Sequence, residues 1–331
     1  MANASNPGYW DEPKVAVVGG AGFIGSHFVD SLLASTKTER VTVFDNFSSG
    51  DECHLADHRN DPRLRIVRGD AGDLNALTEC LTGHTLAIHL ASNPDIAKAM
   101  EDPGVDFRQG TLLTFNVVEA MRTAGVKKIL YASGSGVYGD QGLREMRENF
   151  GPLIPISTYG ASKLAGEALL ACYCYMFGFR ARAFRFANVV GPRQTHGVGL
   201  DFARRLAADP CKLRILGDGS QSKSYIHVLD ILEAVRTAHD HDGPAFEAFN
   251  VGTGDSITVT EIAALAVDAL GLRADAVELS YTGGDRGWKG DVPVVRLNCD
   301  RIRALGWRPT MTSRQAISRS IREILAGPRA A

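Results

Sequence analysis

The sequence has little net charge and lacks long runs of one sign. Its 36 lysines and arginines nearly balance its 38 aspartates and glutamates, which gives a formal charge of −2. Proteins that bind nucleic acid or membrane surfaces usually carry a basic excess, because phosphate groups attract it. The sequence therefore predicts neither a nucleic-acid partner nor a membrane partner. Its hydrophobic content of 44% and charged content of 22% are those of an ordinary globular protein.

Cysteine is scarce and scattered along the chain. Of the six cysteines, only Cys172 and Cys174 are close together, and their C-x-C spacing does not form a four-ligand zinc site. We therefore expect reduced thiols and no bound metal. Residues 1–13 are polar and lack the charged and then apolar stretches of a signal peptide, so we expect a flexible tail and a cytoplasmic protein.

Short β-branched runs alternate with helical stretches over the first half of the chain. The predicted strands cover residues 14–19, 41–44, 64–67, 86–90 and 128–132. This rhythm predicts the Rossmann-like α/β class, a doubly wound parallel sheet with helices on both faces. We expect residues 14–187 to form this domain, with a returning strand near 247–252. Residues 188–331 are expected to form a smaller mixed α/β lobe, interleaved with the first.

A glycine-rich turn follows the first predicted strand. Gly19, Gly22 and Gly25 form a G-x-x-G-x-x-G pattern between strand and helix. Such glycines permit a tight turn, a close approach of backbone N–H groups to a pyrophosphate, and close packing of the helix. The alternative is a close-packed turn that binds no ligand. Asp45 at the end of the next predicted strand favours a dinucleotide site instead. A carboxylate there accepts hydrogen bonds from ribose hydroxyls and repels a 2′-phosphate, so NAD is favoured over NADP.

Other candidate NAD contacts follow the neighbouring strands. Asp70 is placed to meet the adenine, although a solvated turn carboxylate is an equally good interpretation. The remaining candidates come from the same turns and are Phe23, Ile24, Asn46, Ala71, Leu90, Ala91 and Ser92.

Tyr159 and Lys163 lie four residues apart in a segment predicted to be helical, residues 158–177. Side chains at this spacing share one helix face, so the ammonium can lower the pKa of the phenol. A phenolate beside a nicotinamide can remove an O–H proton while hydride leaves carbon. A Y-x-x-x-K pattern alone is usually a surface pair, but its position downstream of an NAD turn favours catalysis.

These motifs together resemble the extended short-chain dehydrogenase/reductases, and within them the nucleotide-sugar 4-epimerases that act on UDP-glucose or UDP-glucuronate. The resemblance is carried, in the family's order, by residues 19–25, 45, 89–91, 133–139, 159–163, 188–193, 217–221 and 290–293. It implies that Tyr159 is the base toward the sugar 4-hydroxyl and that Lys163 lowers the pKa of Tyr159 and binds the nicotinamide ribose. Where the family has a further serine or threonine, this chain has Gly134. We expect Ser133, or as second choice Ser135, to supply the missing hydroxyl.

The resemblance also implies a sugar-nucleotide site in the second lobe. Asn188 is expected to bind the diphosphate, Asp291 a ribose, and the strand from Arg214 to Leu216 the uracil edge through its backbone. Two arginines of the family are replaced, one by Lys223, which keeps the charge. The other is Trp288, for which Arg286 or Lys289 is the candidate substitute. Arg193, Thr195 and His196 are expected to face the hexose, with a solvated turn as the alternative.

The reaction predicted from this resemblance is 4-epimerisation of a UDP-hexose. Related dehydratases, decarboxylases and 3,5-epimerase/reductases carry an acidic residue or a cysteine in the turn that here reads Gly134-Ser135-Gly136. We expect UDP-glucose/UDP-galactose first and UDP-glucuronate/UDP-galacturonate second, because Arg193 could hold a carboxylate.

Two other functions are alternatives to epimerisation. One is an NAD-dependent oxidoreductase with net turnover of a nucleotide-linked or small carbonyl. The other is a non-catalytic NAD sensor, which is disfavoured because Tyr159 and Lys163 are both present. The apolar circumference of segments 112–124 and 158–177, which the family pairs between subunits, predicts a homodimer.

Overall fold

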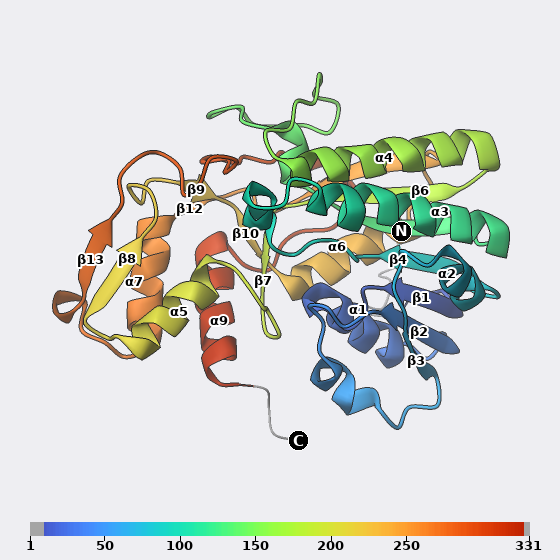
Figure 1. Ribbon diagram of the computed structural model, residues 1–331, viewed down its shortest axis with the longest axis horizontal. Coiled ribbons are helices and arrows are strands. Elements are labelled where there is room, and N and C mark those ends of the chain that lie inside the picture. Colours follow the sequence, from blue (N-terminus) through green and yellow to red (C-terminus); the bar gives the residue numbers. More distant parts are fainter. Residues whose placement is uncertain (1–9, 328–331) are drawn as a thin grey trace.

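The computed structural model describes residues 10–327, so most of the tail expected for residues 1–13 lies outside the described residues. A seven-stranded parallel sheet dominates the molecule, with the strand order β11-β6-β5-β4-β1-β2-β3 (Figure 1). Its strands are β1 (Lys14–Val18), β2 (Arg40–Asp45), β3 (Leu64–Arg68), β4 (Leu86–His89), β5 (Lys128–Gly134), β6 (Arg180–Phe186) and β11 (Phe246–Val251). The doubly wound α/β class predicted from the sequence is confirmed.

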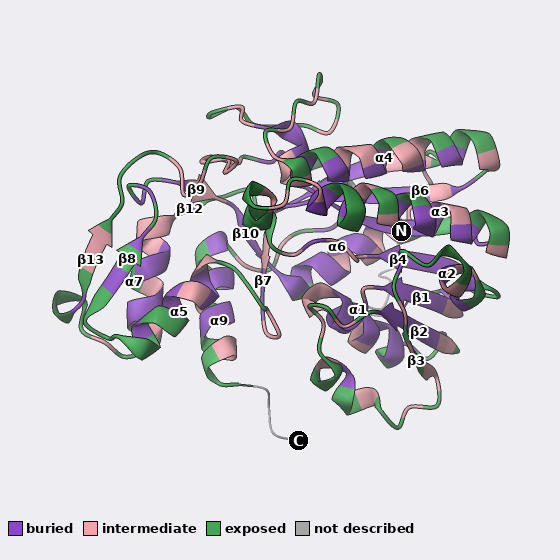
Figure 2. Ribbon diagram, in the orientation of Figure 1, coloured by how far each residue is buried: buried purple, intermediate pink, exposed green. Residues whose placement is uncertain are grey.

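Helices cover both faces of the sheet because successive residues of its strands point to opposite sides. In β1, Val15 and Val17 belong to the core packed under α1 (Phe23–Ala34) and α6 (Val228–Asp240). Ala16 and Val18 belong to the core under α2 (Leu74–Leu81), α3 (Leu113–Ala124) and α4 (Thr158–Phe177). Figure 2 shows the inner strands of the sheet as buried and the outer sides of the helices as exposed, whereas the edge strand β3 is partly exposed.

Strand β6 lies inside the sheet, although the sequence analysis does not predict it. Its sequence, RARAFRF, lacks the continuous apolar run that is typical of a central parallel strand. Arg182 and Arg185 are nevertheless buried, because each has polar partners. The Arg182 guanidinium donates to the Pro244 carbonyl at 2.7 Å, and the Arg185 guanidinium forms an ion pair with Glu167 at 2.7 Å.

A second group of elements packs around a separate core (left in Figure 1). It contains α5 (Val198–Ala208), β8 (Lys212–Ile215), α7 (Val259–Ala269), β13 (Glu278–Tyr281) and α9 (Ser313–Leu325). Short strands pair as β7 (Asn188–Val190) with β10 (Tyr225–His227) and β9 (Ser222–Lys223) with β12 (Ile257–Thr258). The shorter helices are η1 (Glu52–His58), η2 (Ile96–Met100), η3 (Phe107–Leu112), η4 (Ser135–Tyr138), η5 (Ala274–Ala276) and α8 (Asp300–Ala304).

No helix among residues 10–327 combines the length and the apolar character that a bilayer span requires. The same residues contain no group of three or more histidine, cysteine, aspartate or glutamate side chains that could hold a metal ion.

Glu12 attaches the segment before β1 to the body of the domain. Its buried carboxylate forms ion pairs with Lys128 at the start of β5 and His239 in α6, and accepts a hydrogen bond from Thr85. Burial alone would raise the pKa of Glu12, but hydrogen bonds from His239, Lys128 and Thr85 lower it to about 2. The ionised form therefore stabilises the folded state.

We predict that Glu12→Gln lowers the free energy of unfolding by about 1–2 kcal/mol near pH 7. Because the native pKa lies below the ordinary value, this contribution is present above about pH 4.5 and is lost as the pH falls toward 2. Denaturant unfolding at several pH values measures the difference from wild type. Asp11→Asn, which removes an exposed ion pair with Lys37, is the control and should have little effect. An equal loss near pH 7 and near pH 3 would contradict the prediction.

Candidate active site

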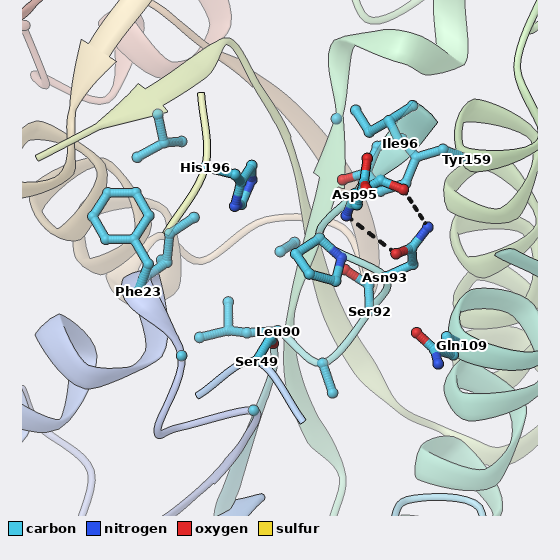
Figure 3. A pocket seen from close by; sticks show the side chains of 18 of the residues that line it. Phe23, Ser49, Leu90, Ser92, Asn93, Asp95, Ile96, Gln109, Tyr159 and His196 are labelled. Carbon is cyan, nitrogen blue, oxygen red and sulfur yellow. Dashed lines mark hydrogen bonds between the residues drawn. The ribbon is translucent and has the colours of Figure 1, made fainter. Parts of the chain in front are cut away.

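A cleft of about 930 Å³ opens at the carboxyl ends of β1, β2, β4 and β5 (Figure 3). Its opposite wall comes from the smaller lobe, through residues 194–199 and 288–295 and β10. The chain order of the sheet reverses between β4 and β1. Ligands of open parallel sheets bind at such a reversal, because the loops that follow the two strands diverge there.

The glycine-rich turn requires its glycines at two positions. Gly19 has φ +85°, and a Cβ there would lie 2.6 Å from the Ala91 backbone nitrogen. A Cβ at Gly25 would lie 2.1 Å from the Gly19 carbonyl oxygen. Gly22 precedes the first residue of α1 and lines the cleft, so the N-terminus of this helix faces the cavity. A turn of this shape fits a dinucleotide pyrophosphate.

Two carboxylates lie beyond this turn. Asp45 accepts hydrogen bonds from the backbone nitrogens of Ala21 and Phe47, each at 2.8 Å, and Asp70 accepts one from Asn46 at 2.9 Å. These bonds hold both side chains at the cleft, where their remaining lone pairs can accept hydroxyl or amino protons. All twelve predicted cofactor residues of these turns line the cleft: Gly19, Gly22, Phe23, Ile24, Gly25, Asp45, Asn46, Asp70, Ala71, Leu90, Ala91 and Ser92.

Tyr159 and Lys163 lie in the first two turns of α4, and both line the cleft. Ser157 caps this helix by accepting a hydrogen bond from the Gly160 nitrogen at 3.1 Å. The Lys163 ammonium lies 5.4 Å from the centroid of the Tyr159 ring. Burial raises the pKa of Tyr159 to about 12, and the charge of Asp106 acts in the same direction. Burial lowers the pKa of Lys163 to about 8, while Asp106 opposes that change.

The end of β5 lies beside the phenol of Tyr159. A Cβ built on Gly134 would lie 3.8 Å from Tyr159 Cε1 and 4.0 Å from its hydroxyl oxygen, so position 134 faces the phenol but carries no side chain. The Ser133 hydroxyl is buried and donates to Glu167 at 2.6 Å. Ser135 lines the cleft, and its hydroxyl forms no hydrogen bond within the part of the chain that the structure describes.

Three predicted substrate residues, Asn188, Lys223 and Asp291, lie together on the opposite wall of the cleft. Lys223 forms an ion pair with Asp291, and both side chains are mostly buried. The Asn188 amide donates to the Ser224 carbonyl at 3.2 Å. Trp288 lines the same wall. A diphosphate entering here would meet one cation, Lys223, that is already paired with a carboxylate.

Four predicted substrate residues do not line the cleft, namely Arg193, Arg214, Leu216 and Arg286. The Arg193 guanidinium forms an ion pair with Asp30 of α1 at 2.7 Å, which directs it away from the cavity. Arg286 pairs with Asp140 at 2.6 Å and also donates to the Asp291 carbonyl, so it braces the loop that carries Asp291. Arg214 and Leu216 are exposed on and after β8.

Asn93, Asp95 and Asp106 were not predicted from the sequence. Figure 3 shows Asn93 and Asp95 in the cleft near Tyr159, with His196 across from them. Burial lowers the pKa of His196, and the charge of Asp95 opposes that change, so Asp95 and His196 share one environment. The Asn-Pro-Asp run that begins four residues after β4 was the available signal for Asn93 and Asp95, since polar residues after a parallel strand reach the ligand edge.

Comparisons with known proteins agree with this geometry. A family model described as "NAD dependent epimerase/dehydratase family" matches residues 15–252. A UDP-glucose 4-epimerase of Mycolicibacterium smegmatis is 33% identical over 318 residues, which covers 93% of this chain and 97% of the relative.

Two solved structures are similar over nearly the whole chain. The crystal structure of a UDP-galactose 4-epimerase is 37% identical, with a TM-score of 0.82, and covers 94% of this chain and 98% of that one. DesIV, a dTDP-glucose 4,6-dehydratase from Streptomyces venezuelae solved with NAD bound, is 28% identical, with a TM-score of 0.86, and covers 95% and 97%.

Proposed function

The chain belongs to the NAD-dependent epimerase/dehydratase family, and we propose that within it the protein catalyses the reversible 4-epimerisation of a UDP-hexose. The observation that carries this proposal is the Tyr159–Lys163 pair, which faces the cleft beside a β5 end that carries neither a carboxylate nor a thiol at residues 134–136. Dehydration needs a further acid and base at the sugar, whereas epimerisation needs only removal and return of hydrogen at C4. Relatives named as UDP-glucose 4-epimerases support the same reaction.

NAD is the cofactor, and the cleft fits it. When bound, it would supply the centre that accepts a hydride from C4 and returns it to the opposite face of the same sugar. In the proposal, the turn from Gly19 to Gly25 holds the pyrophosphate at the N-terminus of α1. Asp45 accepts hydrogen bonds from the adenosine ribose, and Asp70 lies at the adenine end. Lys163 holds the nicotinamide ribose.

Tyr159 is proposed to move the proton of the sugar 4-hydroxyl. Its phenol must be ionised to accept that proton, and the adjacent Lys163 ammonium favours the ionised form. Burial works against ionisation, so the positive charge of Lys163 is needed in the site. We favour Ser135 as the hydroxyl that shares the proton, because Ser133, the first choice from the sequence, donates its hydrogen bond to Glu167.

The sugar is proposed to be a neutral hexose, so that the substrates are UDP-glucose and UDP-galactose. The second choice from the sequence was UDP-glucuronate/UDP-galacturonate, because Arg193 could hold a carboxylate. Arg193 is paired with Asp30 instead, and Asp95 adds a carboxylate to the cleft. A uronate in the cleft would therefore meet the Asp95 carboxylate and would not be neutralised by Arg193.

A homodimer is proposed as the assembly. Residues Phe115 in α3 and Tyr175 and Met176 in α4 are apolar and exposed, Tyr175 by 94% and Met176 by 66%. Leu170 and Tyr173, which lie in the segment 158–177 whose apolar circumference predicted the homodimer, are buried in the core of the monomer instead. These side chains leave exposed apolar surface on both helices, which a second copy would cover. A cytoplasmic location stays a prediction from the sequence.

We predict that the purified protein carries NAD and interconverts UDP-glucose and UDP-galactose without added cofactor. Substrate deuterated at C4 should keep its label in the product, because the hydrogen returns to the sugar that lost it. Product stereochemistry and label are read by NMR, and NADH by absorbance. Loss of the label, or a sustained rise of NADH, would favour the oxidoreductase alternative.

Tyr159→Phe is the control for this assay. It removes the proton acceptor without opening a cavity, so turnover should fall by about 10²-fold or more while NAD stays bound. Lys163→Ala should weaken both turnover and NAD binding, because this residue has both roles in the proposal.

Substitutions of the two serines at the end of β5 should affect different quantities, kcat for Ser135 and the free energy of unfolding for Ser133. Ser135→Ala is expected to lower kcat about tenfold without changing thermal stability, since its hydroxyl faces the cleft. Ser133→Ala should instead lower the free energy of unfolding by about 1 kcal/mol, because the buried Glu167 loses a donor. If Ser133→Ala costs more turnover than Ser135→Ala at unchanged stability, the preference drawn from the sequence is the right one.

Light scattering at micromolar concentration should give the mass of two chains. Met176→Glu places a charge on the exposed face of α4 and should produce monomers. Leu143→Glu, on a loop residue exposed by 68%, is the matched control and should leave the dimer intact. A wild-type protein with the mass of one chain would contradict the proposed homodimer.

A further inference from the structure

Asp106 and Lys163 are buried charged residues near Tyr159, only 1% and 3% exposed. Among residues 10–327, the Asp106 carboxylate has no basic side chain within 4.0 Å, and the Lys163 ammonium has no carboxylate within that distance. A buried charge without compensation costs several kcal/mol. Each of these charges therefore needs an opposite charge nearby, and each is the other's candidate.

Two hydrogen bonds hold Asp106 in place. Thr158, the first residue of α4, donates its hydroxyl to Asp106 at 2.6 Å, and the Asn93 amide donates at 2.9 Å. Asn93 also bonds the backbone of Asp95, as donor to its carbonyl at 2.8 Å and as acceptor from its nitrogen at 3.1 Å (Figure 3). Asp106 thus connects the start of α4, one residue before Tyr159, to the loop after β4 that lines the cleft.

We propose that Asp106 is a positioning residue for the Tyr159–Lys163 pair. It supplies the counter-charge that keeps the buried Lys163 side chain as an ammonium, and it fixes the first turn of α4 against the loop from Asn93 to Asp95. This inference rests on the proposed function for the role of Tyr159, but the ionic relation between Asp106 and Lys163 can be tested without turnover.

The electrostatic effect of Asp106 on the pair has one direction. Its negative charge raises the pKa of Tyr159 and of Lys163, since it disfavours loss of a proton from either group. Removing the charge therefore lowers the pH at which the pair loses its first proton. Within residues 10–327, the other titratable groups around the pair include Asp95 before η2, His89 on β4, Tyr131 on β5, Glu167 on α4 and His196 on the loop across the cleft, and the variants below leave them unchanged.

Asp106→Asn should move the acid limb of the pH profile of kcat/KM to lower pH by about one unit, because it removes the negative charge that disfavours proton loss from the pair. Thr158→Val removes one hydrogen bond but keeps the charge, so it should lower kcat and leave the acid limb in place. Asp106→Glu keeps the charge and should keep the wild-type limb. The proposal is wrong if the limb of Asp106→Asn does not move, or if Thr158→Val moves it equally.

A double-mutant cycle of thermal unfolding tests the counter-charge independently of activity. Asp106→Asn, Lys163→Met and the double variant are compared with wild type near pH 6 in saturating NAD. Each single variant leaves one buried charge, so the double variant should melt higher than the sum of the two single shifts by at least about 2 °C. Folding of the double variant when Asp106→Asn alone fails to fold would also support the proposal. Additive shifts would overturn it, whatever the enzyme's reaction.

Discussion

The arrangement of the active site depends on one buried ion pair, between Glu167 of α4 and Arg185 of β6. Their side chains are each 5% exposed and lie 2.7 Å apart. Glu167 also accepts the Ser133 hydroxyl at the end of β5, and Arg185 donates to the Tyr138 hydroxyl at 2.8 Å. Removing one partner of such a pair costs about 3–5 kcal/mol, because the other charge stays buried. The pair therefore locks α4 to the carboxyl ends of two strands.

This lock explains why Tyr159 and Lys163 face the cleft. Glu167 lies one helical turn after Lys163, so fixing Glu167 fixes the rotation of α4 about its axis. The N-terminal turn is held separately, by Ser157 and by the bond from Thr158 to Asp106. The two attachments leave the phenol and the ammonium in a buried site that opposes both ionised forms. A buried environment that disfavours the ionised forms of its own residues is typical of a functional site, where residues needed for the reaction lower the stability of the fold.

The sequence predicted the parts of the molecule that repeat a local pattern. Strands β1 to β5, the glycine turn with Asp45, and the Tyr159–Lys163 spacing all depend on residues close together in the chain. Strand β6 was missed because its arginines are compensated by partners far away in the sequence, such as Glu167 and the Pro244 carbonyl. Asp106 was missed for the same reason: its partners, Asn93 and Thr158, lie 13 and 52 residues away.

The sequence by itself determined the fold class and the cofactor, and it predicted the Tyr159–Lys163 pair, because periodicity and fixed spacing act within single strands, turns and helices. Only the tertiary structure decided where the remaining side chains point. In the folded chain, Arg193 forms an ion pair with Asp30, and Ser133 donates a hydrogen bond to Glu167. Gly134 faces the phenol of Tyr159 but carries no side chain. A side chain binds the partner that packing brings within hydrogen-bond reach, and that partner is set by the fold of distant segments.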